Sequence, residues 1–148
     1  MGRTMWHKLI PEANIVYVVE DDKSLCNAMR RLLMSAQYRV VTFASAEEFR
    51  LSDFKSRPGC LLLDIRLPGI SGFELQEQLI ASGVPMPVIF ITGQDRAGME
   101  ERAMRLGATA YLRKPVDEET LLDAIRTAMK SHQNHKEKGN GIDRTGTS

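Results

Sequence analysis

The chain has 148 residues, 43% of them hydrophobic, and its 20 Lys and Arg against 19 Asp and Glu leave a net charge of +1. This length predicts one domain with a substantial core, and the balanced charge argues against a nucleic-acid-binding or membrane-surface protein. No apolar run is long enough to span a bilayer. The cysteines, Cys26 and Cys60, form no metal or disulfide pattern, and their apolar neighbours favour buried thiols in a reducing cytoplasm.

The two ends of the chain differ in composition from its middle. Residues 1–13 are expected to form a flexible leader, because they lack the apolar core of a signal peptide. Residues 131–148 are polar and contain three glycines, which predicts a flexible tail or linker. The folded domain is therefore expected over residues 14–130.

Strand-like and helix-like patterns alternate five times between these ends. Strands are expected over residues 15–19, 39–43, 60–63, 87–91 and 109–112. Helices are expected over residues 25–36, from Ser45, from Ser71 to near Gly83, over about 96–106, and over 121–129. Crossovers between parallel strands are right-handed, so helices must cover both faces of the sheet. The pattern predicts a flavodoxin-like α/β fold with five parallel strands in the order 2-1-3-4-5, and the more polar segment 39–43 at an edge.

Five polar residues stand at the ends of the apolar runs, and they are Glu20, Asp21, Asp64, Thr92 and Lys114. Parallel strands end at one edge of the sheet, so these side chains are expected to meet there. Each residue alone has an ordinary interpretation as a turn acid, a strand-end threonine or a surface lysine. Together they favour a functional site. Three carboxylates suit Mg²⁺, and a metal-bound carboxylate beside a hydroxyl and an ammonium is suited to accept a phosphoryl group.

Four segments carry a resemblance to a known family, and they are Val18–Asp22, Leu62–Gly69, Phe90–Gly93 and Tyr111–Pro115. They resemble the receiver domain of bacterial two-component response regulators. The resemblance covers about residues 14–130. Segments 60–72 and 90–93 are most similar to the FixJ type within that family.

The resemblance implies a metal site and a phospho-acceptor. Asp64 would accept the phosphoryl group. Mg²⁺ would be held by Glu20, Asp21, Asp64 and the backbone carbonyl group of Arg66. Glu20 stands where Asp is frequent in the family, and its longer side chain is expected to reach the metal. We further expect the Arg66 side chain to pair with Glu20 when metal is absent, and so to compete with Mg²⁺.

The resemblance also implies a switch. Thr92 and Lys114 would contact the phosphoryl oxygens, and Tyr111 would be the switch aromatic that turns inward as Thr92 moves toward the phosphate. The bond between Lys114 and Pro115 is often cis in the family, and cis bonds concentrate before proline.

The implied function is a cytoplasmic phosphorylation switch, not an enzyme that turns over a substrate. A sensor histidine kinase would donate the phosphoryl group, and water would remove it slowly. The face formed by the last two helices and the last strand would then change partner binding or dimerisation. Alternatively, the chain is the receiver part of a longer helix-turn-helix transcription regulator, since only 18 residues follow Lys130. The chain has no basic recognition helix, so neither direct DNA binding nor membrane association is expected.

Three other classes fit less well. A phosphatase of the haloacid dehalogenase type would need an acid two positions after its nucleophile, where this chain has Arg66. A flavodoxin-like cofactor binder would need a glycine-rich phosphate loop after the first strand. A receiver that acts without phosphorylation would lack one of the five polar residues, and none is lacking.

Overall fold

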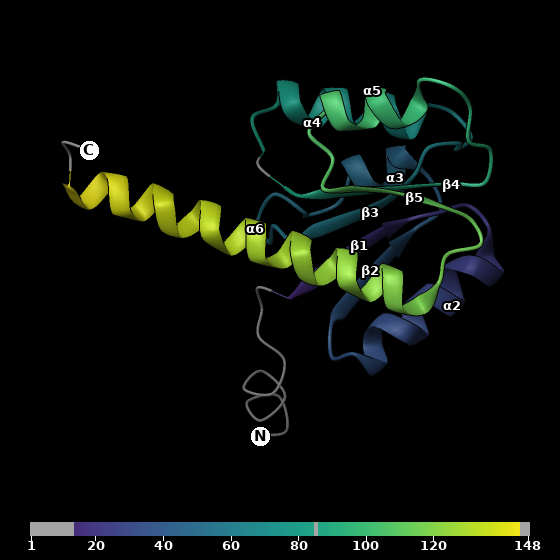
Figure 1. Cartoon of the computed structure of the whole chain (residues 1–148), viewed down its shortest axis with the longest axis horizontal. Helices are drawn as coiled ribbons and strands as arrows, with labels where there is room; N and C mark the ends of the chain where they lie inside the picture. The colour runs from purple at the N-terminus through teal and green to yellow at the C-terminus, as the bar shows by residue number, and fades with distance from the viewer. Residues whose placement is uncertain (1–13, 85, 146–148) are drawn as a thin grey trace.

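The computed structural model describes residues 14–84 and 86–145, and the expected leader lies outside the described residues. Within these ranges, five strands alternate with five helices (Figure 1). The strands are β1 (Ile15–Val19), β2 (Arg39–Phe43), β3 (Cys60–Asp64), β4 (Val88–Thr92) and β5 (Ala110–Arg113). The helices are α2 (Lys23–Ser35), α3 (Ala46–Arg50), α4 (Gly72–Ala81), α5 (Met99–Arg105) and α6 (Glu118–Thr145).

The five strands form one parallel sheet in the order β2-β1-β3-β4-β5, which confirms the predicted fold. Strands β1, β3 and β4 are apolar and fully buried, as expected of strands covered on both faces. The more polar β2 lies at an edge and is partly exposed. The strand order reverses beside β1, and such switch points create ligand crevices at the carboxyl ends of strands.

Side chains alternate between two cores on opposite faces of the sheet. Tyr17 and Leu63 join the core under α3, α4 and α5, whereas Val18 and Leu62 join the core under α2 and α6. Figure 1 shows these two helix layers on either side of the sheet. Both faces of the sheet are therefore buried under helices.

The two predicted capping boxes form to different extents. At the start of α4, the Ser71 hydroxyl accepts from the Glu74 N–H, and the Glu74 carboxylate accepts from the Ser71 N–H, which completes the box. At the start of α3, Ser45 accepts from the Glu48 N–H, but the Glu48 carboxylate accepts from the Ala44 N–H instead. Both helices still begin where the sequence predicts.

The start of α5 and the end of α6 are the helix boundaries that bear most on the predicted organisation of the chain. Helix α5 begins at Met99 instead of near residue 96, because Gly98 has a φ of +86° and cannot belong to a right-handed helix. Helix α6 continues to Thr145, so the expected domain boundary after Lys130 falls inside a helix. The division of the chain into a domain and a tail stays a prediction. None of the described helices is both long and apolar enough to cross a membrane.

Candidate functional site

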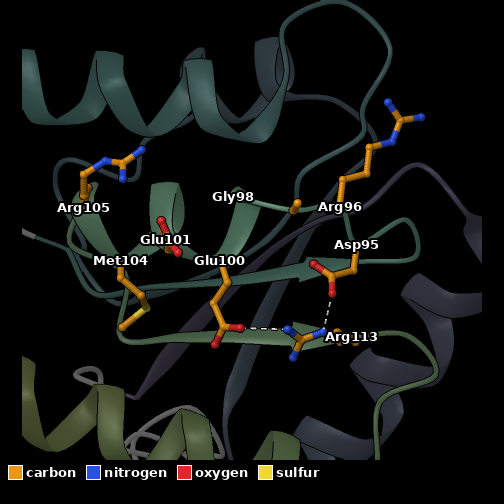
Figure 2. A pocket seen from close by; sticks show the side chains of 9 residues that line it. Asp95, Arg96, Gly98, Glu100, Glu101, Met104, Arg105 and Arg113 are labelled. Atoms are coloured by element: carbon orange, nitrogen blue, oxygen red, sulfur yellow. Dashed lines mark hydrogen bonds and ion pairs between the residues drawn. The ribbon is translucent and has the colours of Figure 1, made fainter.

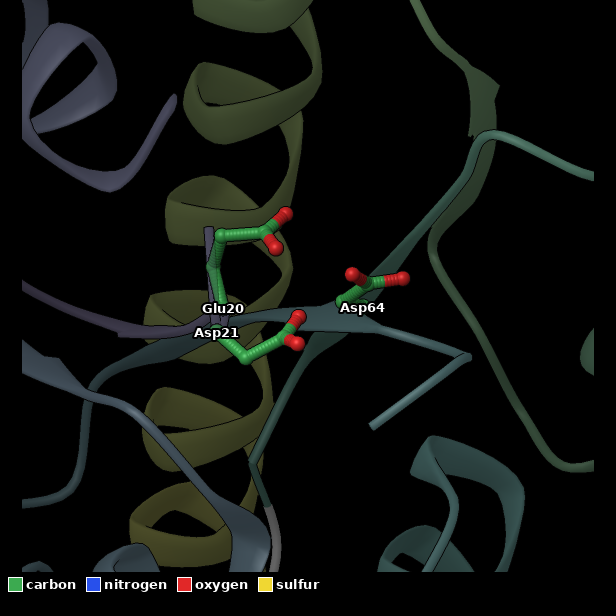
Figure 3. A group of neighbouring side chains, drawn as sticks. All are labelled: Glu20, Asp21 and Asp64. Carbon is green, nitrogen blue, oxygen red and sulfur yellow. The ribbon is translucent and has the colours of Figure 1, made fainter. Parts of the chain in front are cut away.

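Three carboxylates meet at the carboxyl end of the sheet, beside the point where the strand order reverses (Figure 3). Glu20 and Asp21 follow β1, and Asp64 is the last residue of β3. One oxygen atom from each of the three lies within 4.8 Å of the others. Glu20 and Asp64 are buried, while Asp21 is exposed. Negative charges this close destabilise one another, so the group needs a cation.

Lys114, directly after β5, supplies one positive charge to this group. Its Nζ donates a hydrogen bond to Asp64 Oδ2 at 3.0 Å. Nζ also forms an ion pair with the buried Glu20 Oε1 at 2.8 Å. The Lys114 backbone N–H donates to the Thr92 carbonyl oxygen at 2.8 Å, which fixes the lysine beside the end of β4.

Burial and charge act in opposite directions on this ion pair. Burial raises the pKa of the Glu20 carboxyl group, and the contacts with Lys114 and the Asp22 N–H offset only part of that rise. Burial lowers the pKa of Lys114, but the carboxylates of Glu20 and Asp64 outweigh it, so its pKa is raised overall. Lys114 therefore stays charged at neutral pH, while Glu20 holds its proton more readily than a carboxyl group in water.

The donor set fits a hard divalent cation. Three carboxylates offer oxygen ligands from two neighbouring strand ends, and such cations prefer oxygen ligands. The three oxygen atoms lie within 4.8 Å of one another, which is close enough to bind the same ion. The group of Glu20, Asp21 and Asp64 can therefore hold a metal ion.

The backbone after Asp64 keeps its carboxylate in place. The Arg66 N–H donates to Asp64 Oδ1 at 3.1 Å. The Gly72 N–H donates to the Ile65 carbonyl oxygen at 2.9 Å, and a Cβ atom at Gly72 would lie only 2.4 Å from the Asp64 carbonyl oxygen. A glycine is required there because the first turn of α4 lies directly against the end of β3.

The structure does not pair the Arg66 side chain with Glu20. Among the described ion pairs, Lys114 is the cation that contacts Glu20. The Arg66 backbone N–H faces Asp64, while Arg66 itself is exposed. The predicted contact between Arg66 and Glu20 is therefore wrong, because Lys114 contacts both buried carboxylates instead.

An open pocket lies in front of Asp64. Its lining includes Asp21, Asp64, Lys114 and the exposed arginines Arg66, Arg96 and Arg102. Thr92, which is buried, lies at the adjacent strand end, and its Oγ1 accepts from the Gln94 N–H at 3.1 Å. The hydroxyl hydrogen of Thr92 can still be donated. A pocket whose lining includes several cationic side chains favours an anionic ligand.

Tyr111 of β5 is buried and belongs to a second polar group with Asp95, Glu100 and Arg113, and Figure 2 shows the last three. Its hydroxyl donates to Asp95 Oδ1 at 2.6 Å. Arg113 Nε donates to Asp95 Oδ2, and its terminal nitrogen donates to Glu100 Oε1, both at 2.7 Å. Burial and the bond to Asp95 raise the pKa of Tyr111 to about 12.

The sequence predicted Tyr111 as the switch aromatic, and this role stays a prediction, but the sequence did not single out Asp95, Glu100 or Arg113, which bond with it or with one another. Asp95 follows Thr92 by three residues, which is a weak signal, since an acid in an exposed loop is ordinary. The other predicted side chains, Glu20, Asp21, Asp64, Thr92 and Lys114, lie together at the strand ends. The bond between Lys114 and Pro115 is cis, as expected.

Comparison with known proteins gives consistent matches. The model of the response regulator receiver domain matches residues 16–126. Nodulation protein W of Bradyrhizobium diazoefficiens is 41% identical over 123 residues, which cover 83% of this chain and 54% of the relative. The solved structure of the response regulator StyR has a TM-score of 0.79 and 39% identity, covering 90% of this chain and 69% of that one. The structure of FixJ-N has a TM-score of 0.71 and 30% identity, covering 78% and 93%. This chain spans about half the length of the curated relatives that it matches.

Proposed function

The chain belongs to the response regulator receiver domain family, and from that membership we propose that it is a phospho-accepting switch of a two-component phosphorelay, with Asp64 as the acceptor. One observation carries the choice of Asp64. Its buried carboxylate contacts the Lys114 ammonium group and lies beside the carboxylates of Glu20 and Asp21, at a pocket lined with arginines. In this position, the Lys114 ammonium group next to Asp64 can pair with the oxygens of an incoming phosphoryl group.

In the proposed reaction, an Asp64 carboxylate oxygen attacks the phosphorus of a phosphohistidine on a sensor histidine kinase. The O–P bond forms as the P–N bond breaks, and the electron pair leaves on the imidazole nitrogen, which takes a proton from water. Lys114 Nζ, which contacts Asp64 Oδ2, would then pair with a phosphoryl oxygen, and the Thr92 hydroxyl would donate to another. Water would later hydrolyse the acyl phosphate slowly, which resets the switch without turnover of a substrate.

Mg²⁺ is the proposed cofactor. Glu20, Asp21, Asp64 and the backbone carbonyl oxygen of Arg66 would hold it, and the cluster of three carboxylate oxygens within 4.8 Å of one another supports this assignment. When bound, Mg²⁺ offsets the repulsion between the acceptor carboxylate and the phosphoryl group.

Tyr111 and Thr92 are proposed to carry the change to the surface. The added phosphoryl group has a charge of about −2 near neutral pH and would attract the Thr92 hydroxyl. Movement of Thr92 would displace the loop that contains Asp95, to which Tyr111 donates. The face of α5, β5 and α6 would change as a result, and a partner protein or a second copy of the chain would bind there.

The test is the intact mass of the protein after incubation with Mg²⁺ and acetyl phosphate. One phosphoryl adduct is expected for the wild type and none for Asp64→Asn. Asp22→Asn is the matched control, because Asp22 is adjacent to the acidic group but caps α2 instead. An adduct that persists in Asp64→Asn, or that disappears in Asp22→Asn, would reject Asp64 as the acceptor.

The output is a separate proposal. The matched relatives are about twice as long as the aligned region, and they include proteins named as transcriptional regulators, which supports a receiver part of a longer helix-turn-helix regulator in the cytoplasm. Sedimentation of the phosphorylated chain tests this, since dimerisation is the expected response of such a receiver. A monomer that instead binds another protein would favour a stand-alone switch.

A further inference from the structure

The loop between β3 and α4 is tied to a helix that is distant in the sequence. The Ile70 N–H donates to Glu47 Oε1 of α3 at 3.1 Å, across 23 residues. The preceding residue, Gly69, has a φ of +78°, and a Cβ atom there would lie 2.5 Å from the same oxygen. The loop therefore closes tightly against the Glu47 carboxylate.

The same loop begins at the proposed site. Its Arg66 N–H bonds to Asp64, and its last residue, Ser71, caps α4. The described hydrogen bonds of residues 66, 71 and 72 connect the loop only to residues close by in the sequence, between Asp64 and Glu74. The bond from Ile70 to Glu47 instead attaches the loop, one residue before its end, to another element.

Glu47 and its neighbour Glu48 have different partners although both lie in the first turn of α3. The Glu48 carboxylate accepts from the Ala44 N–H, just before its own helix. The Glu47 carboxylate accepts from the Ile70 N–H, and this bond lowers the pKa of Glu47 below its usual value. Glu47 is therefore ionised at neutral pH and is a strong acceptor for the loop.

We propose that Glu47 is a positioning residue whose carboxylate anchors the loop of residues 66–71, and thereby keeps the Arg66 backbone in reach of the Mg²⁺ site. This role rests on the proposed function for its effect on Mg²⁺, but the anchoring itself does not. Loss of the anchor lets the loop move, so Mg²⁺ binding must then also order the loop, which weakens its affinity.

Three variants test the proposal. Glu47→Ala removes the acceptor, Glu47→Gln keeps an oxygen that can accept from Ile70, and Glu48→Ala removes an equal charge from the same turn without touching the loop. Hydrogen exchange of the Ile70 amide reports the anchor, and calorimetric titration with Mg²⁺ reports the site. Urea unfolding identifies any variant that is globally destabilised.

In Glu47→Ala, we expect Ile70 exchange to become about tenfold faster and the Mg²⁺ dissociation constant to rise about tenfold, the scale of one hydrogen bond to a charged group. Glu47→Gln and Glu48→Ala should stay within about threefold of the wild type. The proposal would be overturned if Glu48→Ala changed Ile70 exchange and Mg²⁺ affinity as much as Glu47→Ala does. It would also be overturned if Glu47→Gln changed them as much as Glu47→Ala does. If the wild type binds no Mg²⁺, the proposed function fails, while the exchange data still decide whether Glu47 anchors the loop.

Discussion

Arg113 and Lys114 are neighbours in the sequence, yet each bridges two carboxylates in a different environment. Lys114 contacts Glu20 and Asp64, whose side chains are only 2% and 5% exposed. Arg113 is itself 52% exposed, and both of its acidic partners are more than a third exposed. Burial is thus the main difference between the two groups.

This difference determines what each group can do. Water and salt screen the Arg113 pairs, so these pairs contribute little to the free energy of unfolding. The Lys114 group is poorly screened, so any change in its charge alters both stability and ligand binding. The buried group is suited to sense a phosphoryl group, whereas the exposed group is suited to hold Tyr111 and the loop around Asp95 in place.

The largest expected effect is on stability. Lys114→Met should lower the free energy of unfolding by about 3 kcal/mol without divalent cations, because two buried carboxylates lose their cation. Addition of Mg²⁺ should recover part of the loss. Arg113→Met is the matched control and should lower the free energy of unfolding far less, with no dependence on Mg²⁺. Urea unfolding followed by circular dichroism measures the free energy of unfolding of both variants. Equal losses would show that burial does not make the Lys114 contacts more important for stability than the Arg113 contacts.

A second effect concerns Mg²⁺ affinity and pH. Burial raises the pKa of Glu20, so Mg²⁺ must compete with a proton as the pH falls through that raised pKa. The dissociation constant should rise by up to about tenfold per pH unit there. The pKa of Asp95 is lowered by its bonds to Tyr111 and Arg113, so the exposed group stays charged over the same range.

Calorimetric titration between pH 5 and 8 measures this dependence. Glu20→Gln should bind Mg²⁺ more weakly but with a flatter pH profile, while Arg113→Met should follow the wild type. An unchanged slope in Glu20→Gln would mean that another group takes up the proton. Without metal, the raised pKa of Glu20 contributes stability at low pH that is lost as the pH rises from about 4.5 through the raised pKa.

The smallest effect is expected at Tyr111. Tyr111→Phe removes the bond to Asp95, which keeps its bond to Arg113, so the cost at neutral pH should be about 1 kcal/mol. The pKa of Tyr111 is raised from 10.0 to about 12, so its contribution is fully present below pH 10 and is lost as the pH rises toward 12. Unfolding measured from pH 8 to 11 should show the difference between wild type and variant narrowing. If the difference in unfolding free energy between wild type and variant did not change with pH, ionisation of the Tyr111 hydroxyl would not be linked to its bond with Asp95.

The strand ends were predictable because a local pattern and a topological rule determine them together. Apolar runs identified β1, β3 and β4, and the parallel arrangement then placed Glu20, Asp64 and Thr92 at one edge. To place such a residue, it is enough to know which strand it follows and at which end of that strand it lies. Their roles in phosphoryl transfer and Mg²⁺ binding stay predictions.

Contacts between side chains on separate elements were not predictable in the same way. The sequence suggested Arg66 as the partner of Glu20, but Lys114 lies closer, because the backbone bond to Thr92 holds it there. The contact between Glu47 and Ile70 depends on how α3 lies against a loop that no periodic pattern describes. Such contacts follow from tertiary packing, which the local sequence does not encode.

Gly72 has a mechanical consequence for the molecule. A single methyl group at this position would meet the Asp64 carbonyl oxygen at 2.4 Å, so main chain rests on main chain with no side chain between them. No rotamer change can absorb a displacement at that point. The end of β3 and the start of α4 must therefore move as one rigid joint, and a substitution as small as Gly72→Ala would push the helix and the strand apart.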